Sequence, residues 1–361
     1  MTKIEFMEKL SAGLKARQSD ETADSLLADF NEHFEEALRA GQCEEEICEM
    51  LGDPEEIAAE CSEHIEAKRS GQTGENENAI DDPGIFIRLF DMGLYCEGWD
   101  GNDFHVEVRQ NNKVIQDDAI KVRQSANSLQ IVQEREWNFI HHLFHVFRLP
   151  KVVRVKIPRR FCGNMSVKVT SGSARIDGVS IEGDMRCEVS SGSIKMLQTR
   201  ASGALTLSAR SGSIKTESCI GNLSAECHSG SVKITSHKGN VLKAAATSGS
   251  VRIDADRITK DCSLSAKSGS IRIDIDALEA NLNLDCYSGS IKFSIGELKG
   301  NITGKTRSGS IVGMLNRDTR AVFLLQSADV SNKFPNAVMP DADIPIISLS
   351  SRSGHVNIKE L

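Results

Sequence analysis

The sequence predicts a mainly-β chain, in which a single-stranded-repeat β-solenoid of about nine coils of ~20 residues follows a small N-terminal all-α domain. The triplet Ser-Gly-Ser recurs every 18 to 20 residues through the C-terminal half, and such a period is typical of solenoids. The first part of the chain has the apolar period of helices instead. Aromatic residues make up only 5% of the chain, which favours thin β coils over a bulky globular core.

The helical domain is expected over residues 1–68. Its first helix fits residues 3–17, and its predicted core stripe consists of Ile4, Met7, Leu10 and Leu14. A second helix is capped by Ser19 or Asp20 and ends at Gly41, and a third ends at Gly52. Asp53 caps a fourth helix, in which Pro54 takes the first position, where its missing N–H costs nothing.

This domain resembles a known family. The residues that carry the resemblance are Phe6-x3-Leu10-x3-Leu14, then Asp29-Phe30-x2-His33-Phe34-x6-Gly41, then Leu51-Gly52-Asp53-Pro54-x2-Ile57-Ala58. They are similar to the bacterial HAAS signalling domain, a small helical module of Gram-positive bacteria that is often found beside PadR-type transcription regulators. The resemblance implies a protein partner, and a PadR-type regulator is the candidate that it suggests.

The charge of the chain is divided unevenly. Residues 1–68 hold 19 acidic and 6 basic side chains, whereas the whole chain has a net charge of −8, so the remainder is mildly basic. The acidic excess has two interpretations. The carboxylates either hydrate outer helix faces and favour helix N-termini, or form a dedicated surface for a partner. We expect no direct nucleic-acid binding.

Residues 69–84 are polar and lack periodicity, which predicts a flexible linker. Residues 85–160 are expected to hold a cap and the strands that lead into the solenoid, because residues 103–109, 129–135 and 152–157 alternate like strands.

Three histidines occur within five residues of this region, at His141, His142 and His145. Such a cluster could bind a transition metal, although no acid or cysteine lies nearby in sequence to complete the site. The alternatives are a surface loop or cap over the end of the solenoid, and an aromatic patch that touches a partner or a lipid surface.

The solenoid is expected over residues 161–361, with a looped insertion at 314–345, where the period breaks and three prolines occur. Each coil is predicted to contain two strands joined by a Ser-Gly-Ser corner, where glycine permits a tight turn or a positive φ. Apolar or small residues at alternate positions before the corner, and the residue directly after it, should face inward. A ninth, altered copy begins at Ser353. The corner glycines are Gly172, Gly192, Gly212, Gly230, Gly249, Gly269, Gly289 and Gly309.

An outward basic residue follows the corner in seven successive coils. At ~4.8 Å per coil, this basic row would span about 29 Å. It is either a solvated outer face, whose repulsion is offset by acids two residues further on, or a surface for a polyanion or an acidic partner. The basic row consists of Arg175, Lys195, Lys215, Lys233, Arg252, Arg272 and Lys292.

The repeat region also resembles a known family. Its residues Val153-Arg154-Val155-Lys156-Ile157-Pro158, then Val167-x-Val169-x-Ser171-Gly172-Ser173, then repeated Ser-Gly-Ser-Ile-Lys are similar to an adhesin-like family of β-strand-repeat proteins, a domain of unknown function. The resemblance extends from about residue 100 to the C-terminus and implies no enzyme activity. The family name implies a surface role, whereas the N-terminus here has no apolar signal core.

No motif in the sequence predicts catalysis. It lacks a glycine-rich phosphate loop, a nucleophile elbow, metal-ligand spacing and a paired-carboxylate motif, so we expect no enzyme activity and no cofactor. The ten cysteines are scattered without a C-x-x-C pair and predict reduced thiols, as in a cytoplasmic protein. No apolar segment is long enough to predict a membrane span.

These observations favour a non-enzymatic interaction or scaffold protein of a bacterial signalling or transcription-control unit. Its helical head would bind a protein partner, and its solenoid would serve as a display surface. One alternative is a structural or adhesin-like solenoid that self-associates through its open sheet edges. Another is a carbohydrate-binding or carbohydrate-active solenoid, which would need a cleft with an acid pair.

Overall fold

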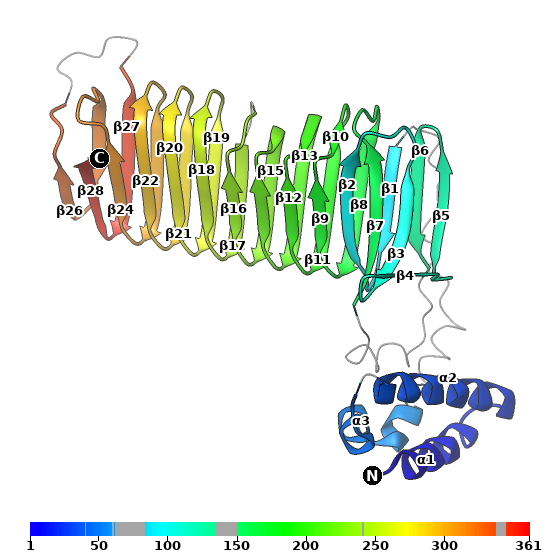
Figure 1. Ribbon diagram of the computed structural model, residues 1–361. Coiled ribbons are helices and arrows are strands. Elements are labelled where there is room, and N and C mark those ends of the chain that lie inside the picture. The colour runs from blue at the N-terminus through cyan, green and yellow to red at the C-terminus, as the bar shows by residue number, and fades with distance from the viewer. Residues whose placement is uncertain (40, 60, 62–83, 135–149, 240–241, 337–343) are drawn as a thin grey trace. The chain divides into compact units, whose positions relative to one another are not determined.

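The computed structural model describes residues 1–39, 41–59, 61, 84–134, 150–239, 242–336 and 344–361 (Figure 1). The chain divides into a helical unit and a β unit, each of which is described by itself. The histidine cluster at 141–145 and residues 69–83 of the expected linker lie outside the described residues.

The helical unit contains α1 (Lys3–Lys15), α2 (Asp20–Arg39), α3 (Glu44–Leu51) and a further helical segment at residues 54–59. A capping box begins α1, in which the Glu5 backbone N–H donates to the Thr2 hydroxyl and the Thr2 N–H donates to the Glu5 carboxylate. The core of the unit includes Phe6, Leu10, Leu14, Phe30, Phe34, Ile47 and Ile57.

The prediction of the core stripe is wrong at one residue. Ile4 is 70% exposed, and Met7 is only partly buried. Phe6 is the residue that fills the core at this point, and its ring lies 6.3 Å from that of Phe34. The stripe is therefore centred one position away from the predicted one, which leaves Ile4 in contact with solvent.

The β unit is a solenoid of about nine coils, whose described strands form two 14-stranded sheets (Figure 1). Sheet A contains β1 (Gly84–Leu89), β5 (Ile120–Ser125), β6 (Ser128–Gln133), β8 (Asn164–Ser171), β10 (Ser180–Ile181), β11 (Met185–Ser191), β13 (Arg200–Ser211), β15 (Ile220–Ser229), β17 (Leu242–Ser248), β19 (Cys262–Ser268), β21 (Leu282–Ser288), β23 (Ile302–Ser308), β25 (Val322–Gln326) and β27 (Ile346–Ser353).

Sheet B faces sheet A, and most coils contribute one strand to each. It contains β2 (Gly93–Trp99), β3 (His105–Gln110), β4 (Lys113–Ile115), β7 (Lys151–Pro158), β9 (Ala174–Asp177), β12 (Ile194–Leu197), β14 (Ile214–Glu217), β16 (Val232–Thr235), β18 (Val251–Ile258), β20 (Ile271–Leu278), β22 (Ile291–Leu298), β24 (Ile311–Leu315), β26 (Asp329–Asn332) and β28 (His355–Glu360).

Successive coils stack as parallel strands in register. In sheet B, Ile271 pairs with Val251 on one side and Ile291 on the other, and all three are fully buried. Burial alternates along the strands, as in β19 and β21, where every second residue faces the interior. These observations confirm the predicted mainly-β solenoid with a small helical domain. Each coil buries its inward-facing apolar residues against the coils stacked on it, which one coil could not do alone.

The turn opposite the Ser-Gly-Ser corner is tight in the coils from β9 to β16. It holds a residue with positive φ, such as Gly178 at +62° or Ser236 at +51°, and the residue after it points inward. This inward position is taken by Val179, Thr199, Cys219 and His237 in successive coils. A column of buried side chains, of which Thr199 and His237 are polar, therefore lies under this turn.

The stretch 314–345, expected to be a looped insertion, instead contains the outermost coil of the C-terminal end. Strand β27 lies between β23 and β25, and β28 lies between β24 and β26, so the chain forms the outer coil first and then returns inside it. In this coil, the turn between the two strands contains only residues 327–328, whereas the neighbouring coil uses residues 351–354 at the same place. The Ser-Gly-Ser period therefore breaks here. The Ser327 hydroxyl donates to the Gly354 carbonyl at 2.6 Å.

The N-terminal end has the same reversed order. The coil of β1 and β2 lies between the β8–β9 coil and strands β6 and β7, which come later in the chain than β1 and β2. Antiparallel strands complete this end, with β5 on β6 and the β3–β4 hairpin on β7. At the other end, Phe334 is 7% exposed and stacks on Phe323, whose N–H donates to the Asn336 side chain at 2.8 Å.

Candidate interaction surfaces

The basic row lies on the outer face of sheet B. Parallel pairing places Lys195 beside Arg175 and Lys215, and the same register continues from Lys215 to Lys292. Its residues alternate along each strand with fully buried ones, such as Ile194, Ile214 and Val232. All seven sequence-predicted basic residues are therefore neighbours in one line across seven strands.

The structure extends this row by two residues that the sequence analysis missed. Tyr95 pairs with Arg175 on one side and with Arg154 on the other. The guanidinium carbons of Arg154 and Arg175 lie 5.2 and 5.3 Å from the Tyr95 ring centroid, which is the geometry of a cation–π contact. No Ser-Gly-Ser triplet precedes these residues, so the repeat could not identify them.

Most of the basic row has no ionic partner within the described part of the chain. Arg175 pairs with Asp177 at 3.1 Å and Lys215 with Glu217 at 3.7 Å, and the other five members have no ion pair there. Two positions further along the strands lies a parallel acid row, which is interrupted by Leu197 and Thr235 and consists of Glu97, Asp177, Glu217, Asp254 and Asp274. This acid row runs beside the basic row on the same face.

The corner glycines stack directly on one another. A Cβ atom added at Gly212 or Gly249 would lie 1.9 Å or 1.8 Å from the carbonyl oxygen of the preceding corner glycine, and φ is positive at both. The eight corner glycines thus form one ladder whose spacing requires the absence of a side chain. The serines after the first six of these glycines add a second ladder, in which, for example, the Ser193 backbone N–H donates to the Ser173 hydroxyl at 3.2 Å.

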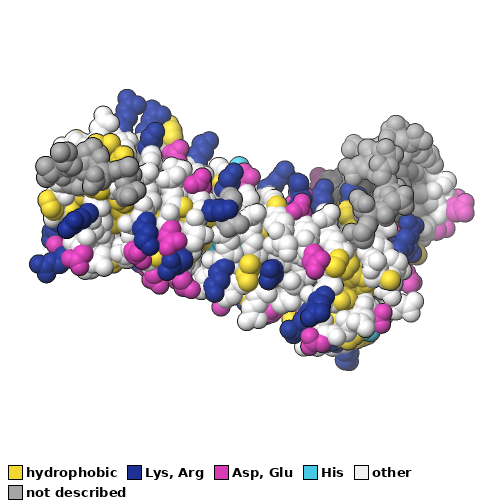
Figure 2. Space-filling model, turned by 90° about the horizontal axis from the view of Figure 1, so that it is seen from above, with side chains coloured by type: hydrophobic (Ala, Val, Ile, Leu, Met, Phe, Trp, Pro, Cys, Tyr) yellow, Lys and Arg dark blue, Asp and Glu magenta, His cyan; other side chains and the backbone are white. Residues whose placement is uncertain are grey.

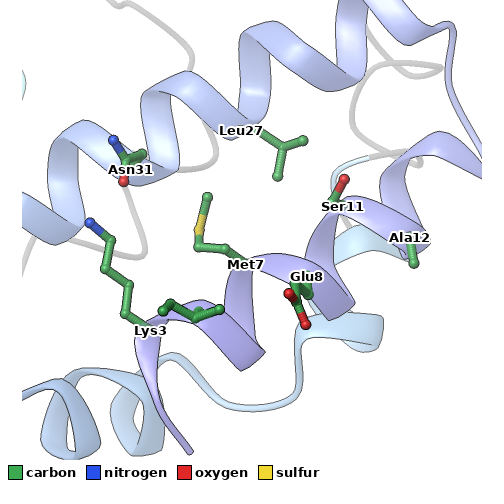
Figure 3. Close-up of a pocket in the computed structure, with 8 residues that line it drawn as sticks. Lys3, Met7, Glu8, Ser11, Ala12, Leu27 and Asn31 are labelled. Atoms are coloured by element: carbon green, nitrogen blue, oxygen red, sulfur yellow. The ribbon is translucent and has the colours of Figure 1, made fainter.

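The helical unit offers a different kind of surface. A groove of about 710 Å³ lies between α1 and α2, and Figure 3 shows Met7 and Leu27 directed toward its interior from the two helices. Ile4 and Ala12 add apolar surface, while Lys3 is held by an ion pair with Glu35 at 2.5 Å. The groove is therefore apolar at its base and polar along its rim.

The buried titratable groups are neutral. Burial lowers the pKa of His237 to about 4, and it raises the pKa of the Cys187 and Cys262 thiols to about 12. None of the ten cysteines forms a disulfide in the structure. Among the described residues, no three His, Cys, Asp or Glu side chains are grouped so that they could hold a metal ion, and no helix is long and apolar enough to cross a membrane.

Two family models match the chain. The model described as Toastrack DUF4097 matches residues 97–322, which is more than half of the chain, and the HAAS model matches residues 5–60. Both are non-catalytic families. The curated proteins contain no match, and neither do the solved structures.

Proposed function

Because the chain belongs to the Toastrack DUF4097 family and carries a HAAS domain, we propose that it is a non-enzymatic interaction or scaffold protein of a bacterial signalling or transcription-control unit. The helical head binds a protein partner, and the solenoid is a rigid display surface. The association of HAAS domains with regulators makes a PadR-type regulator the first candidate for that partner. Thiols such as those of Cys187 and Cys262, which are buried without a disulfide, support a reducing compartment such as the cytoplasm.

The groove between α1 and α2 carries this proposal. Ile4, which is 70% exposed, lines this groove together with other apolar side chains, and a contiguous exposed apolar surface is typical of an interaction site. Its neighbours Met7 and Leu27 are only partly buried, so the apolar surface is continuous. A groove of this kind between two helices accepts one face of an amphipathic helix.

The test compares two single substitutions in the full chain. Ile4→Glu places a charge in the groove without disturbing the core, because Ile4 is largely exposed. Ala28→Glu adds the same charge at an exposed position of α2 that does not line the groove. Each tagged variant is used for affinity capture from the native cell, and the captured partner is then purified and its binding measured directly.

We expect the partner to be lost with Ile4→Glu and retained with Ala28→Glu. Introducing one unpaired charge into an apolar contact should weaken binding by at least about tenfold. Equal binding by both variants, or a captured regulator that does not bind the purified chain, would contradict a head that acts through this groove.

Self-association through the sheet edges is the second candidate function. The exposed apolar residues Leu324 and Val330 of the outermost coil favour it. The buried Phe334 ring and the hydrogen bond from the Phe323 N–H to the Asn336 side chain oppose self-association, because they cover part of the C-terminal end of the solenoid. Light scattering over a concentration series distinguishes the two: a mass that stays constant supports the interaction module, and a growing mass supports the polymer.

A further inference from the structure

One edge of the solenoid carries basic side chains without acidic ones. Around each of the eight Ser-Gly-Ser corners, the six positions from the residue before the triplet to the basic-row position contain no Asp or Glu. We call this edge the crest: the triplets, the basic row, and the residue just before each triplet. The last group adds three cations, Arg210, Lys267 and Arg307. The crest therefore has bases on both sheets and a narrow, uncharged ridge between them.

The ridge itself presents hydrogen-bond donors. The hydroxyl oxygens of Ser173, Ser193, Ser213, Ser231 and Ser250 each accept a backbone N–H from the following coil at 3.2 to 3.3 Å. With one oxygen lone pair occupied in this way, each O–H is left to donate outward. Donating hydroxyls repeat once per coil along the ridge, flanked by ammonium and guanidinium groups.

The opposite edge of the solenoid is different in character. Figure 2 shows that edge, where Lys and Arg side chains are interspersed with Asp and Glu. Several of these charges pair with one another, since Glu279 contacts both Arg257 and Lys299, and Lys299 also contacts Glu297 at 2.9 Å. Charges that pair with one another within the solenoid are thus found at this edge, whereas five members of the basic row on the crest have no ion pair among the described residues.

We propose that the crest binds an extended acidic segment of a partner protein, which lies along the solenoid axis. This inference deepens the proposed interaction function by adding a second binding surface to that of the head. Carboxylates of the segment meet Lys and Arg on both sides of the ridge and accept hydrogen bonds from the serine hydroxyls. Because each exposed ion pair contributes little, binding depends on several coils acting together.

The borders of the crest favour a single polypeptide over nucleic acid. Glu226 on sheet A and Asp254 on sheet B mark the acidic positions on either side of the crest. A duplex, whose major groove alone is about 12 Å wide, would bring phosphates over these acids. Single-stranded nucleic acid relies on aromatic stacking. The crest carries one exposed tyrosine, Tyr287, whose ring is already in contact with the Arg307 guanidinium, and the six coils from Arg175 to Arg272 contain no Phe, Tyr or Trp at crest positions.

The test measures fluorescence anisotropy of a labelled poly-glutamate peptide of about 12 residues with the full chain. Nine extended residues at ~3.3 Å already match the length of the basic row. Salt is varied from ~50 to ~500 mM, because exposed ion pairs are screened at high salt. The crest variant is Lys195→Glu with Lys233→Glu, and the control is Lys238→Glu with Lys260→Glu, which changes the net charge equally near the opposite edge.

We expect salt-sensitive binding that the crest variant weakens about tenfold, because each reversal removes an exposed ion pair and adds a repulsion. The control should bind within about twofold of the unmodified chain, and the milder Lys195→Gln with Lys233→Gln should fall between the two. Circular dichroism checks that each variant is folded.

Three results would overturn the assignment: no binding at low salt, equal weakening in the control, or tighter binding of a single-stranded oligonucleotide of the same charge. The last result would make the crest a nucleic-acid surface. If the crest assignment fails while partner capture still depends on Ile4, the function proposed for the head stands without a second surface.

Discussion

Replacing Gly249 with alanine should strongly destabilise the solenoid. The new Cβ would lie 1.8 Å from the carbonyl oxygen of Gly230 in the preceding coil, and φ at this position is +152°. The two coils would have to separate, which stretches the hydrogen bonds between them from the Gly230 N–H to the Ser248 carbonyl and from the Val232 N–H to the Ser250 carbonyl, both at 3.0 Å. The backbone strain contributes ~1–3 kcal/mol and each weakened hydrogen bond about 1 kcal/mol.

The matched control is Gly178→Ala. Gly178 also has positive φ, at +62°, but an added Cβ would meet nothing within 4 Å. Its cost is therefore the left-handed backbone alone, about 1 kcal/mol. Taking a total of about 4 kcal/mol for Gly249→Ala, and ~2–4 °C of melting temperature per kcal/mol, the two variants should lose roughly 10 °C and 3 °C. Thermal melts followed by circular dichroism measure both, and equal losses would refute the stacked glycine ladder.

Three further predictions follow from burial. Ile271→Asp should lower the free energy of unfolding by at least about 4 kcal/mol, because it buries an unpaired charge between coils. Arg272→Asp on the outer face should lower it by under about 1 kcal/mol, and equal melting temperatures of the two variants would contradict the assignment of inner and outer faces. A thiol reagent should label Cys43 and Cys162 in the native chain and the other eight cysteines only after unfolding, since those eight are buried; rapid labelling of all ten would contradict this. The folded-state pKa of His237, about 4, lies below its unfolded value of about 6.5, so the unfolded chain binds the extra proton between these values. Stability should thus be complete above pH ~6.5 and fall by roughly 3 kcal/mol as the pH drops to about 4, a loss that His237→Leu should remove in acid-unfolding curves.

The sequence predicted those features that each coil repeats locally. The inward positions and the corner glycines follow from a period of two within strands and a period of about 20 between coils. The reversed order at both ends was not predictable, because the repeat encodes how a coil folds and not which coil becomes its neighbour. The first coil also lacks the triplet: its turn is held by the Gln133 side chain, which accepts a hydrogen bond from the Phe90 N–H at 2.8 Å. For the same reason, Tyr95 and Arg154 were missed as parts of the basic row.

The basic row is not required by the fold. In the register of sheet B, Val312 pairs with Lys292, and Asn357 follows Val312, so the same outward position accepts an apolar and a neutral polar residue in the last coils. Like charges on adjacent strands repel by somewhat under ~1 kcal/mol per pair before salt screening, so a neutral residue would be at least as stable at these positions. Four consecutive pairs of the row, from Lys195 to Arg272, nevertheless juxtapose two cations. The neighbouring acid row offsets part of this repulsion, and the negatively charged ligand that we propose for the crest would convert the remainder into favourable contacts.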